Sequence, residues 1–399
     1  MWPSVSYEEL PWRIDPDERA MISKTARRRI ASSYQAAIPA EIASLNLAIP
    51  EALSARIGEL LVKLARFDEL QAARGYDLPA LLLRSESAAS SQIEHLTSSV
   101  RNVALAELTS EAPANARIVQ GNIAAMRTAL SLSASTTVDQ IRAVHEALIA
   151  PTGASFGGEI RDEQVWVGGT AYSPHGALFV PPAPQRLGGA LEDLVGFIRR
   201  DDINPVAKAA IAHAQFETIH PFIDGNGRTG RVLLHIVLAS EGVLSRSTLP
   251  VSAGLLHDVD DYMAAIRAYQ QGDPMPIVIC TIEALELALV IGGRVSALMD
   301  EVMDAWMKDI KERAGSSIWR LPALLAEQPV VTIAFVAEKL GITPRAASTL
   351  VGRACAYGML RPMGSRRRGE YFQSDELIDI LEEISSVPGI RRVLASGAQ

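Results

Sequence analysis

Apolar positions recur at helical spacing along most of this chain. The stretch from about residue 16 to 120 is rich in Ala and Leu and has few strand signals, so we expect a helical N-terminal region over residues 1–120. Thr137 precedes an amphipathic pattern and predicts a capped helix over 137–150. Further helices are expected over about 204–219, 228–240 and 258–269. The pattern therefore favours a mainly α protein.

Two short segments alone in the first 300 residues carry convincing strand patterns. They are Gln164–Val167 and Ala177–Val180, joined by a long polar connection. Such a pair predicts a small β-hairpin over 163–181. Exposed hairpins can bind an extended peptide through main-chain hydrogen bonds, so Trp166 and Phe179 either line side-chain pockets or simply pack.

The pattern changes again from about residue 316, to short helices followed by a basic turn. Residues 333–340 and 345–357 are predicted to form a helix-turn-helix, with Thr343 as the cap of the second helix. Short strands at 360–362 and 370–372 would flank a basic wing, which indicates a winged helix. Between Thr343 and Phe372 there are six arginines and one acidic residue, a balance that suits DNA backbone contact as well as protein contact.

Length, charge and cysteine content limit the number of domains and the classes of partner. The 399 residues suggest two or three units, and a net charge of −8 argues against affinity of the whole molecule for nucleic acid or membranes. The apolar run from 276 to 293 is interrupted by Glu283 and Glu286, so it is predicted to be a core helix, with no membrane partner. Two cysteines, Cys280 and Cys355, fit reduced thiols in a cytoplasmic protein.

The most informative segment runs from His220 to Arg231, with the sequence HPFIDGNGRTGR. Glycines on both sides of Asn226 let backbone N–H groups approach an anion, and the following helix directs its N-terminus the same way. Arg228 and Arg231 project from one helix face and can hold a polyphosphate. Asp224 is a hard oxygen ligand suited to Mg²⁺, and His220 is suited to accept a proton.

This segment resembles the signature of the Fic family, His-x-Phe-x-Asp/Glu-Gly-Asn-Gly-Arg-x-x-Arg, at every specified position. The resemblance implies a helical core with a β-hairpin flap over the site, and transfer of AMP from ATP to a Tyr, Ser or Thr hydroxyl of a target protein. His220 would be the base, Asp224 the Mg²⁺ ligand, and the flap at 163–181 the target-docking element. ATP would contact residues Gly225, Asn226, Gly227, Arg228, Thr229, Gly230, Arg231 and Tyr262.

A second resemblance concerns Ser90 and Glu94, which match the Ser/Thr-x-x-x-Glu pattern of the family's inhibitory helix. It implies a helix around 84–95 whose Glu94 presses on Arg231 and blocks the nucleotide γ-phosphate. His95 departs from the family's Gly or Asn at a position that often adopts a left-handed conformation. The expected division is an N-terminal region over 1–120, a Fic core over 121–295, a linker helix over 296–320 and a winged helix over 321–390.

Two other functions remain open at this point. The chain could be a DNA-binding regulator acting through 343–372, with the core as a nucleotide sensor. It could also remove AMP from modified targets, with Glu94 orienting a water molecule. A homodimer is compatible with either function.

Overall fold

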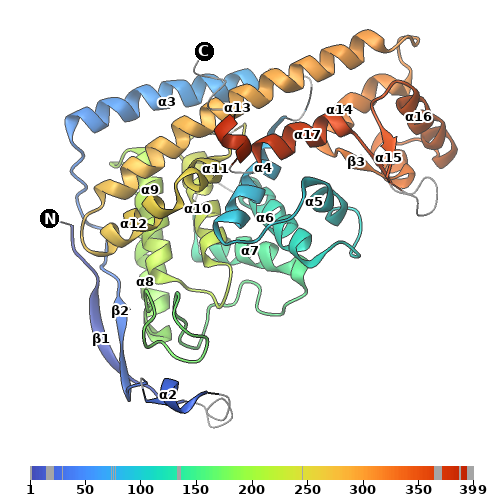
Figure 1. Ribbon diagram of the computed structural model, residues 1–399. Helices are drawn as coiled ribbons and strands as arrows, with labels where there is room; N and C mark the ends of the chain where they lie inside the picture. Colours follow the sequence, from blue (N-terminus) through green and yellow to red (C-terminus); the bar gives the residue numbers. More distant parts are fainter. Residues whose placement is uncertain are drawn as a thin grey trace.

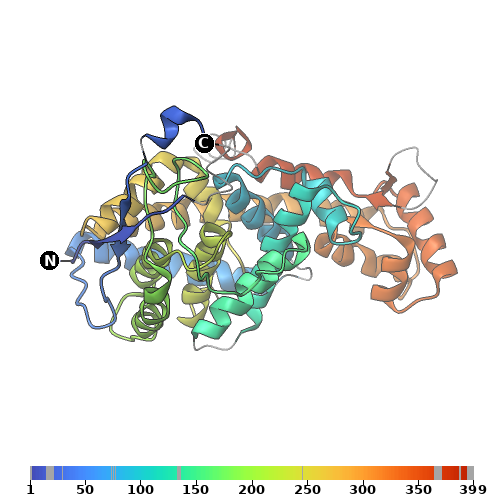
Figure 2. The same ribbon diagram turned by 90° about the horizontal axis from the view of Figure 1, so that it is seen from below.

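The structure is a computed structural model that describes residues 2–14, 22–28, 30–72, 74, 76, 78–132, 136–244, 246–363, 371–385 and 388–392. Helices dominate it, and the prediction of a mainly α fold is confirmed. Figures 1 and 2 both place an N-terminal hairpin and a C-terminal unit at opposite ends of a helical body.

The N-terminal hairpin corrects the expectation of an all-helical region over 1–120. Strands β1 (Ser6–Pro11) and β2 (Ser33–Ile38) pair antiparallel, with Ser6 opposite Ile38, and the short α2 (Lys24–Arg27) lies between them. The Ala-rich β2 reads as helix by propensity, yet Ala37 N–H donates to Val180 O at 2.9 Å. Pairing with neighbouring backbone therefore overrides local preference in this segment.

The helical body comprises α3 to α13. Thr137 caps α7 through a reciprocal pair of hydrogen bonds with Gln140, as the sequence predicts. Asn204 caps α9 by accepting from Val206 N–H. The bounds are α3 (Glu51–Ala72), α4 (Leu78–Ile93), α5 (Val100–Ala106), α6 (Ala114–Ser131), α7 (Val138–Ile149), the 3₁₀ turn η1 (Ala150–Thr152), α8 (Pro184–Ile198), α9 (Pro205–Ile219), α10 (Asn226–Ser240), α11 (Val251–His257), α12 (Val259–Gln270) and α13 (Met275–Asp309).

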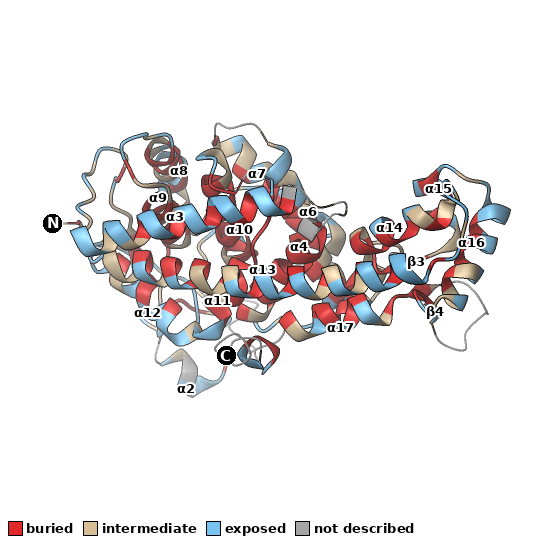
Figure 3. Cartoon of the chain, turned by 90° about the horizontal axis from the view of Figure 1, so that it is seen from above, coloured by how far each residue is buried: buried red, intermediate tan, exposed pale blue. Residues whose placement is uncertain are grey.

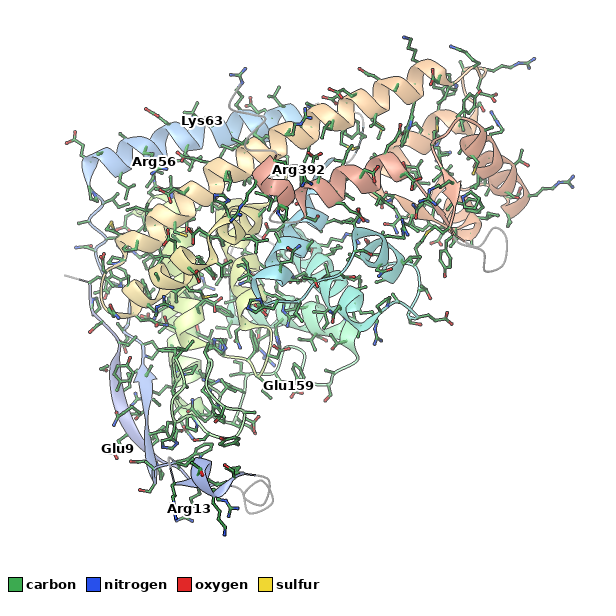
Figure 4. All side chains as sticks on the ribbon, in the orientation of Figure 1. Glu9, Arg13, Arg56, Lys63, Glu159 and Arg392 are labelled. Atoms are coloured by element: carbon green, nitrogen blue, oxygen red, sulfur yellow. The ribbon has the colours of Figure 1, made fainter. Side chains whose placement is uncertain are left out.

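Helix α13 is the long helix that runs along the helical body. Figure 3 shows α3 and α13 lying side by side with their exposed positions outward. Arg56, which projects from α3 in Figure 4, pairs with Glu286 of α13 at 2.6 Å. By length and apolar composition α13 passes as a membrane span, but half of its most apolar window is buried in the protein. Its 35 residues also run through the predicted boundary at 295–296, so the core and the linker helix are continuous.

The C-terminal unit contains the predicted helix-turn-helix. Thr343 accepts from Ala346 N–H, Pro344 opens the second helix, and Gly341 ends the first in a left-handed conformation. A three-stranded sheet in the order β3-β5-β4 follows, with Arg361 opposite Gln373. The elements are η2 (Ser317–Arg320), α14 (Leu321–Glu327), β3 (Val330–Val331), α15 (Ile333–Leu340), α16 (Pro344–Ala356), β4 (Arg361–Pro362), β5 (Phe372–Gln373) and α17 (Asp375–Ile384).

The predicted basic turn of this unit, residues 364–370 with Arg366, Arg367, Arg368 and Glu370, lies outside the described residues.

The segment 163–181 is less regular than the hairpin predicted for it. It contains two isolated antiparallel bridges, Val167 with Phe179 and Thr170 with Ser173, instead of continuous strands. Two glycines after Val167 adopt positive φ, at 74° and 78°, and break the strand pattern. The chain still folds back on itself here, because Val167 and Phe179 exchange backbone hydrogen bonds.

Candidate functional site

The loop between α9 and α10 is held by its own side chains. His220 ends α9 in a left-handed conformation with φ 51°, and Gly225 precedes α10 with φ 80°. Asn226 clamps the turn, because its Oδ1 accepts from Phe222 N–H at 2.9 Å and its Nδ2 donates to Phe222 O at 2.8 Å. The loop is therefore shaped before any ligand arrives.

His145 supports this loop from α7, a role that no pattern in the sequence predicts. Its ring stacks on Phe222 with centroids 3.7 Å apart and planes 5° apart. Gly158 N–H donates to Nδ1 at 2.9 Å, so the proton lies on Nε2, which donates to Asp224 O at 2.9 Å. Burial lowers the pKa of His145 to about 4, which keeps this neutral tautomer at ordinary pH.

His220 lies at the cavity wall with one ring nitrogen engaged. Its Nδ1 lies 3.3 Å from Glu217 O, and donation to that carbonyl leaves Nε2 as a proton acceptor. Burial lowers its pKa to about 4, below the ordinary range for histidine. The imidazole is consequently neutral and ready as a base throughout the physiological range, though it is a weaker base than a free histidine.

Arg161 is a second residue that sequence reasoning missed. Its guanidinium is buried and donates to three carbonyl oxygens, those of His220 at 2.9 Å, Glu163 at 2.9 Å and Pro182 at 2.7 Å. Its own N–H donates to Pro221 O at 3.0 Å. One side chain thus fastens both ends of the 163–181 segment to the peptide that carries His220.

The two motif arginines converge on Glu94, as the sequence predicts for Arg231. Arg231 Nη2 donates to Glu94 Oε1 at 2.8 Å, and Arg228 Nε lies 3.3 Å from Glu94 Oε2. Glu94 therefore bridges two guanidinium groups with one oxygen each, where a bidentate contact with Arg231 alone was expected. Ser90 completes the contact, because its Oγ and its carbonyl oxygen accept from Arg231 Nε and Nη2 at 2.9 and 2.8 Å.

The surroundings of Glu94 have the features of an anion site. Both arginines are at most 3% exposed, and Arg228 Nε and Nη1 are buried without a hydrogen-bond acceptor among the described residues. A Cβ on Gly227 would lie 2.3 Å from Glu94 Oε1, so only glycine leaves this space open. Buried cations that lack acceptors are costly, and a phosphate group in the place of the carboxylate would satisfy them.

His95 adopts the left-handed conformation expected at the end of the inhibitory segment, with φ 60°. Only His95 and His220 among the described non-glycine residues have positive φ. Histidine tolerates this region less easily than Gly or Asn, so the turn after Glu94 carries backbone strain.

Asp224 lies at the mouth of the site with its side chain 64% exposed. Its Oδ2 accepts from Arg228 Nη2 at 3.2 Å. The described residues contain no group of three His, Cys, Asp or Glu side chains suited to a metal. A single accessible carboxylate nevertheless fits Mg²⁺, which commonly takes one or two carboxylates and completes its shell with phosphate oxygens and water.

A cavity of about 850 Å³ extends from these residues toward α12. His220, Asp224, Gly225, Asn226, Gly227, Arg231 and Tyr262 line it, together with Trp166, Val167, Leu178 and Phe179 of the 163–181 segment. Arg228, Thr229 and Gly230, which were predicted to contact nucleotide, do not line it. Gly230 faces α9 instead, where a Cβ would lie 2.7 Å from Glu217 Oε1, so its role is close packing of two helices.

Tyr262 reaches the cavity as part of a buried network on α9. Its hydroxyl lies 2.8 Å from His213 Nε2, and Glu217 lies one turn further along α9. Burial raises the pKa of Glu217 to about 7, while the nearby Arg231 lowers it, and its Oε1 is buried without a hydrogen-bond partner. Neither Glu217 nor His213 could be found from the sequence, since both fall on a helix that is buried all round.

The burial of His213 makes the free energy of unfolding depend on pH. Burial and Arg231 lower its pKa to about 3, so the unfolded chain binds an extra proton below about pH 6.5. Stability from this residue is complete above pH 6.5 and is lost as pH falls toward 3, by at most about 1.4 kcal/mol per pH unit.

We expect His213→Gln to flatten the fall in melting temperature between pH 6.5 and 4 relative to the unmutated protein. The raised pKa of Glu217 acts with the opposite sign between about pH 4.5 and 7, so the difference between the two proteins is the quantity to measure. Parallel melting curves would contradict the neutral, buried state of His213.

The arrangement is a helical domain with a preformed loop, a neutral imidazole at the cavity wall and a carboxylate held between two buried arginines. Residues 135–238 match the model of the Fic/DOC family. This chain is 31% identical to protein adenylyltransferase fic-1 of Caenorhabditis elegans over 145 residues, which are 36% of this chain and 26% of that protein. Over 98 residues, 24% of the chain, it is 36% identical to a probable protein adenylyltransferase of Aquifex aeolicus and covers 28% of it.

Residues 135–238 of the chain therefore form a Fic domain. The chain spans about a quarter of the length of the curated relatives it matches. The fold is also that of a Fic family protein from Desulfovibrio desulfuricans G20, with a TM-score of 0.54 and 19% identity over 82% of this chain and 97% of that one.

Proposed function

We propose that this protein transfers AMP from ATP to a hydroxyl group of a target protein, and that Glu94 holds it in an inhibited state. The relatives that match its Fic domain are named protein adenylyltransferases. The observation that carries the proposal is the buried arginine pair closed by Glu94, in which Arg228 Nε and Nη1 have no hydrogen-bond acceptor among the described residues.

The proposed reaction uses residues that line one cavity together with Arg228, which reaches Glu94 at the edge of that cavity. Backbone N–H groups at 225–227 receive the α-phosphate of ATP, and Arg228 and Arg231 hold the β- and γ-phosphates once Glu94 has withdrawn. His220 Nε2 takes the proton of the target hydroxyl, whose oxygen bonds to the α-phosphorus. The bond from that phosphorus to the bridging oxygen breaks, and pyrophosphate leaves.

Mg²⁺ fits beside Asp224, where it would neutralise phosphate charge when bound. Tyr262, which is buried against His213, would form part of the wall beside the adenine ring. Gly227 leaves open the space beside Glu94 and Arg231, which the β- and γ-phosphates would take.

The 163–181 segment is the proposed docking element for the target. Leu178 is 81% exposed and Val167 is 38% exposed, and both line the cavity that contains His220. Exposed apolar side chains on an extended segment can receive a peptide by main-chain pairing, which aligns a hydroxyl without demanding a long sequence. Arg161 would keep this alignment in register with His220.

The test is incubation of the unmutated protein and of Glu94→Gly with ATP labelled at the α-phosphate, Mg²⁺ and a cell lysate, with γ-labelled ATP in parallel. Label from the α-position alone on protein bands supports nucleotidyl transfer. Label from the γ-position would show kinase chemistry instead, and release of AMP from previously labelled bands without new labelling would show the reverse reaction.

A second candidate function, binding of DNA by residues 343–372 as a winged helix, rests on the exposed face of α16. Arg345 is exposed there and has no ion pair among the described residues. Two of the six arginines counted in the sequence are already neutralised by carboxylates, however. Arg353 pairs with Glu312 at 2.5 Å, and Arg361 pairs with Asp375.

If this face binds DNA, Arg345→Ala should weaken binding to all duplex sequences alike and lower the salt slope by about one. Gel shifts across a series of salt concentrations measure this slope. The matched control is Arg353→Ala, whose charge is already engaged. Equal binding by Arg345→Ala and the unmutated protein would leave protein contact as the role of the unit.

A further inference from the structure

Helix α4 presents three polar side chains to the Fic core at four-residue intervals. Glu86 accepts from Ser252 N–H at 2.7 Å and from the Ser252 hydroxyl, and lies 3.1 Å from His235 Nε2. Ser90 and Glu94 continue the same face and engage Arg231. These contacts position Glu94 from one face of α4. The opposite face of α4 makes contacts of its own.

The opposite face of α4 is held by the C-terminal unit and α17. Arg84 Nη2 donates to Gln328 Oε1 at 2.6 Å, and Gln328 Nε2 donates to Ala104 O at 2.9 Å. Ser85 Oγ donates to Ile384 O at 3.3 Å, and Gln92 Nε2 donates to Ser385 O. Gln92 lies two residues before Glu94, so the last turn of α4 is held by Arg231 on one face and by Ser385 on the other.

Helix α17 is itself carried by α13. Trp306 Nε1 of α13 donates to Glu376 Oε2 at 2.6 Å, and α17 buries Leu377, Leu381 and Ile384 completely. Figure 1 shows α17 running beside α13 and crossing close to α4. Contacts with α4 thus come from the end of a unit whose other end, the helix-turn-helix, projects from the body.

These contacts differ in kind from those of the active site. Arg84 and Ser85 are buried on α4 nine or ten residues before Glu94, and Gln328 is buried at the end of α14. None of these three lines the cavity, although Gln92 does. Their loss would leave the phosphate-binding loop intact, because that loop is held by Asn226 and His145. Any effect on nucleotide binding must then pass through α4.

We propose that the C-terminal unit positions the inhibitory glutamate: docking of Gln328 and α17 on α4 keeps Glu94 between Arg228 and Arg231, and undocking releases it. This inference rests on the proposed function, since it names how the same site is regulated. A partner that binds the projecting unit and pulls α17 away would activate the enzyme, and one that binds without moving α17 would not.

Gln328→Leu and Ile384→Glu, each made in the full chain, test the proposal. Gln328→Leu removes both hydrogen bonds to the α4–α5 region, and Ile384→Glu places a charge in the α17 contact. Both should raise affinity for a non-hydrolysable ATP analogue by about fivefold or more, as expected when a contact of ordinary hydrogen-bond strength is removed from the closed state. The matched control is Glu382→Gln on the exposed face of α17, which should change nothing.

The same variants in a Glu94→Gly background show whether the effect on nucleotide affinity depends on Glu94. If α4 acts through Glu94, the gain in analogue affinity disappears there, since the two changes are not additive. Amide hydrogen exchange of α4 should rise in Gln328→Leu and stay unchanged in Glu382→Gln. An equal gain in both backgrounds, or unchanged affinity in folded Gln328→Leu, overturns the proposal.

Misfolding of a variant and failure of the proposed function can each be distinguished from failure of this proposal. If Ile384→Glu does not fold, as circular dichroism would show, Gln328→Leu alone decides the matter. If Glu94→Gly transfers no label, the proposed function fails, but analogue affinity and hydrogen exchange still report whether the C-terminal unit positions Glu94.

Discussion

Replacement of His220 by asparagine or alanine should abolish AMP transfer, with a loss of about 10²–10⁴ in kcat, the range for removal of a positioned base. Nε2 of His220 is the free nitrogen on the cavity wall, and its Nδ1 is already engaged by Glu217 O. The measurement is the initial rate of labelling from α-labelled ATP in a Glu94→Gly background, where inhibition does not mask the loss.

Asparagine is the better of the two replacements. His220 has φ 51°, and asparagine adopts that left-handed conformation with little strain, whereas alanine does not. His220→Asn should therefore keep the melting temperature and the affinity for an ATP analogue while it loses activity. Near-normal labelling by a folded His220→Asn variant would refute the assignment of the base.

Glu94→Gly should have the second large effect, activation of transfer with tighter ATP binding. The carboxylate occupies two buried guanidinium groups that would otherwise receive phosphate, and its withdrawal is needed before ATP can bind productively. Charge-assisted contacts of this kind contribute about 1.5–3 kcal/mol, so a gain of tenfold or more in analogue affinity is expected. Titration calorimetry and labelling rates measure the two effects separately.

The same substitution should also destabilise the protein without nucleotide. Removal of one partner of a buried ion pair leaves Arg228 and Arg231 with uncompensated charge, which lowers the melting temperature. ATP then restores the missing anion, so the gain in melting temperature on ATP addition should be larger in Glu94→Gly than in the unmutated protein. Glu94→Gln, which keeps the shape and removes the charge, is the control, and an equal gain in all three proteins would contradict the inhibitory role.

The sequence predicts most of the catalytic loop because its chemistry is local. His220, Asp224 and the two arginines fall within twelve residues around one helix start, and turn glycines reveal the backbone path. The helix-turn-helix is also readable, since Thr343, Pro344 and Gly341 are local signals for helix ends. The role of Glu94 came from resemblance, because nothing within α4 alone distinguishes it from a solvated glutamate.

Local patterns failed where the stabilising contacts are distant in sequence. Strand β2 pairs with β1 and contacts Val180, so an Ala-rich segment that favours helix became a strand. The segment 163–181 has the alternation of a hairpin, but its positive-φ glycines and the anchoring by Arg161 leave it as a loop with isolated bridges. Helix α13 runs unbroken through the boundary expected at 295–296, and beyond it Trp306 contacts α17.

By itself, the sequence determined a mainly helical protein, and it predicted a phosphate-binding loop with its base and arginines from spacing along one segment. Only the tertiary structure decided that Glu94 bridges both arginines, that burial keeps His220 neutral, and that Arg161 and His145 hold the loop. It also decided that the C-terminal unit grips α4. Burial, charge proximity and hydrogen bonds across hundreds of residues depend on how helices pack, and no local pattern records them.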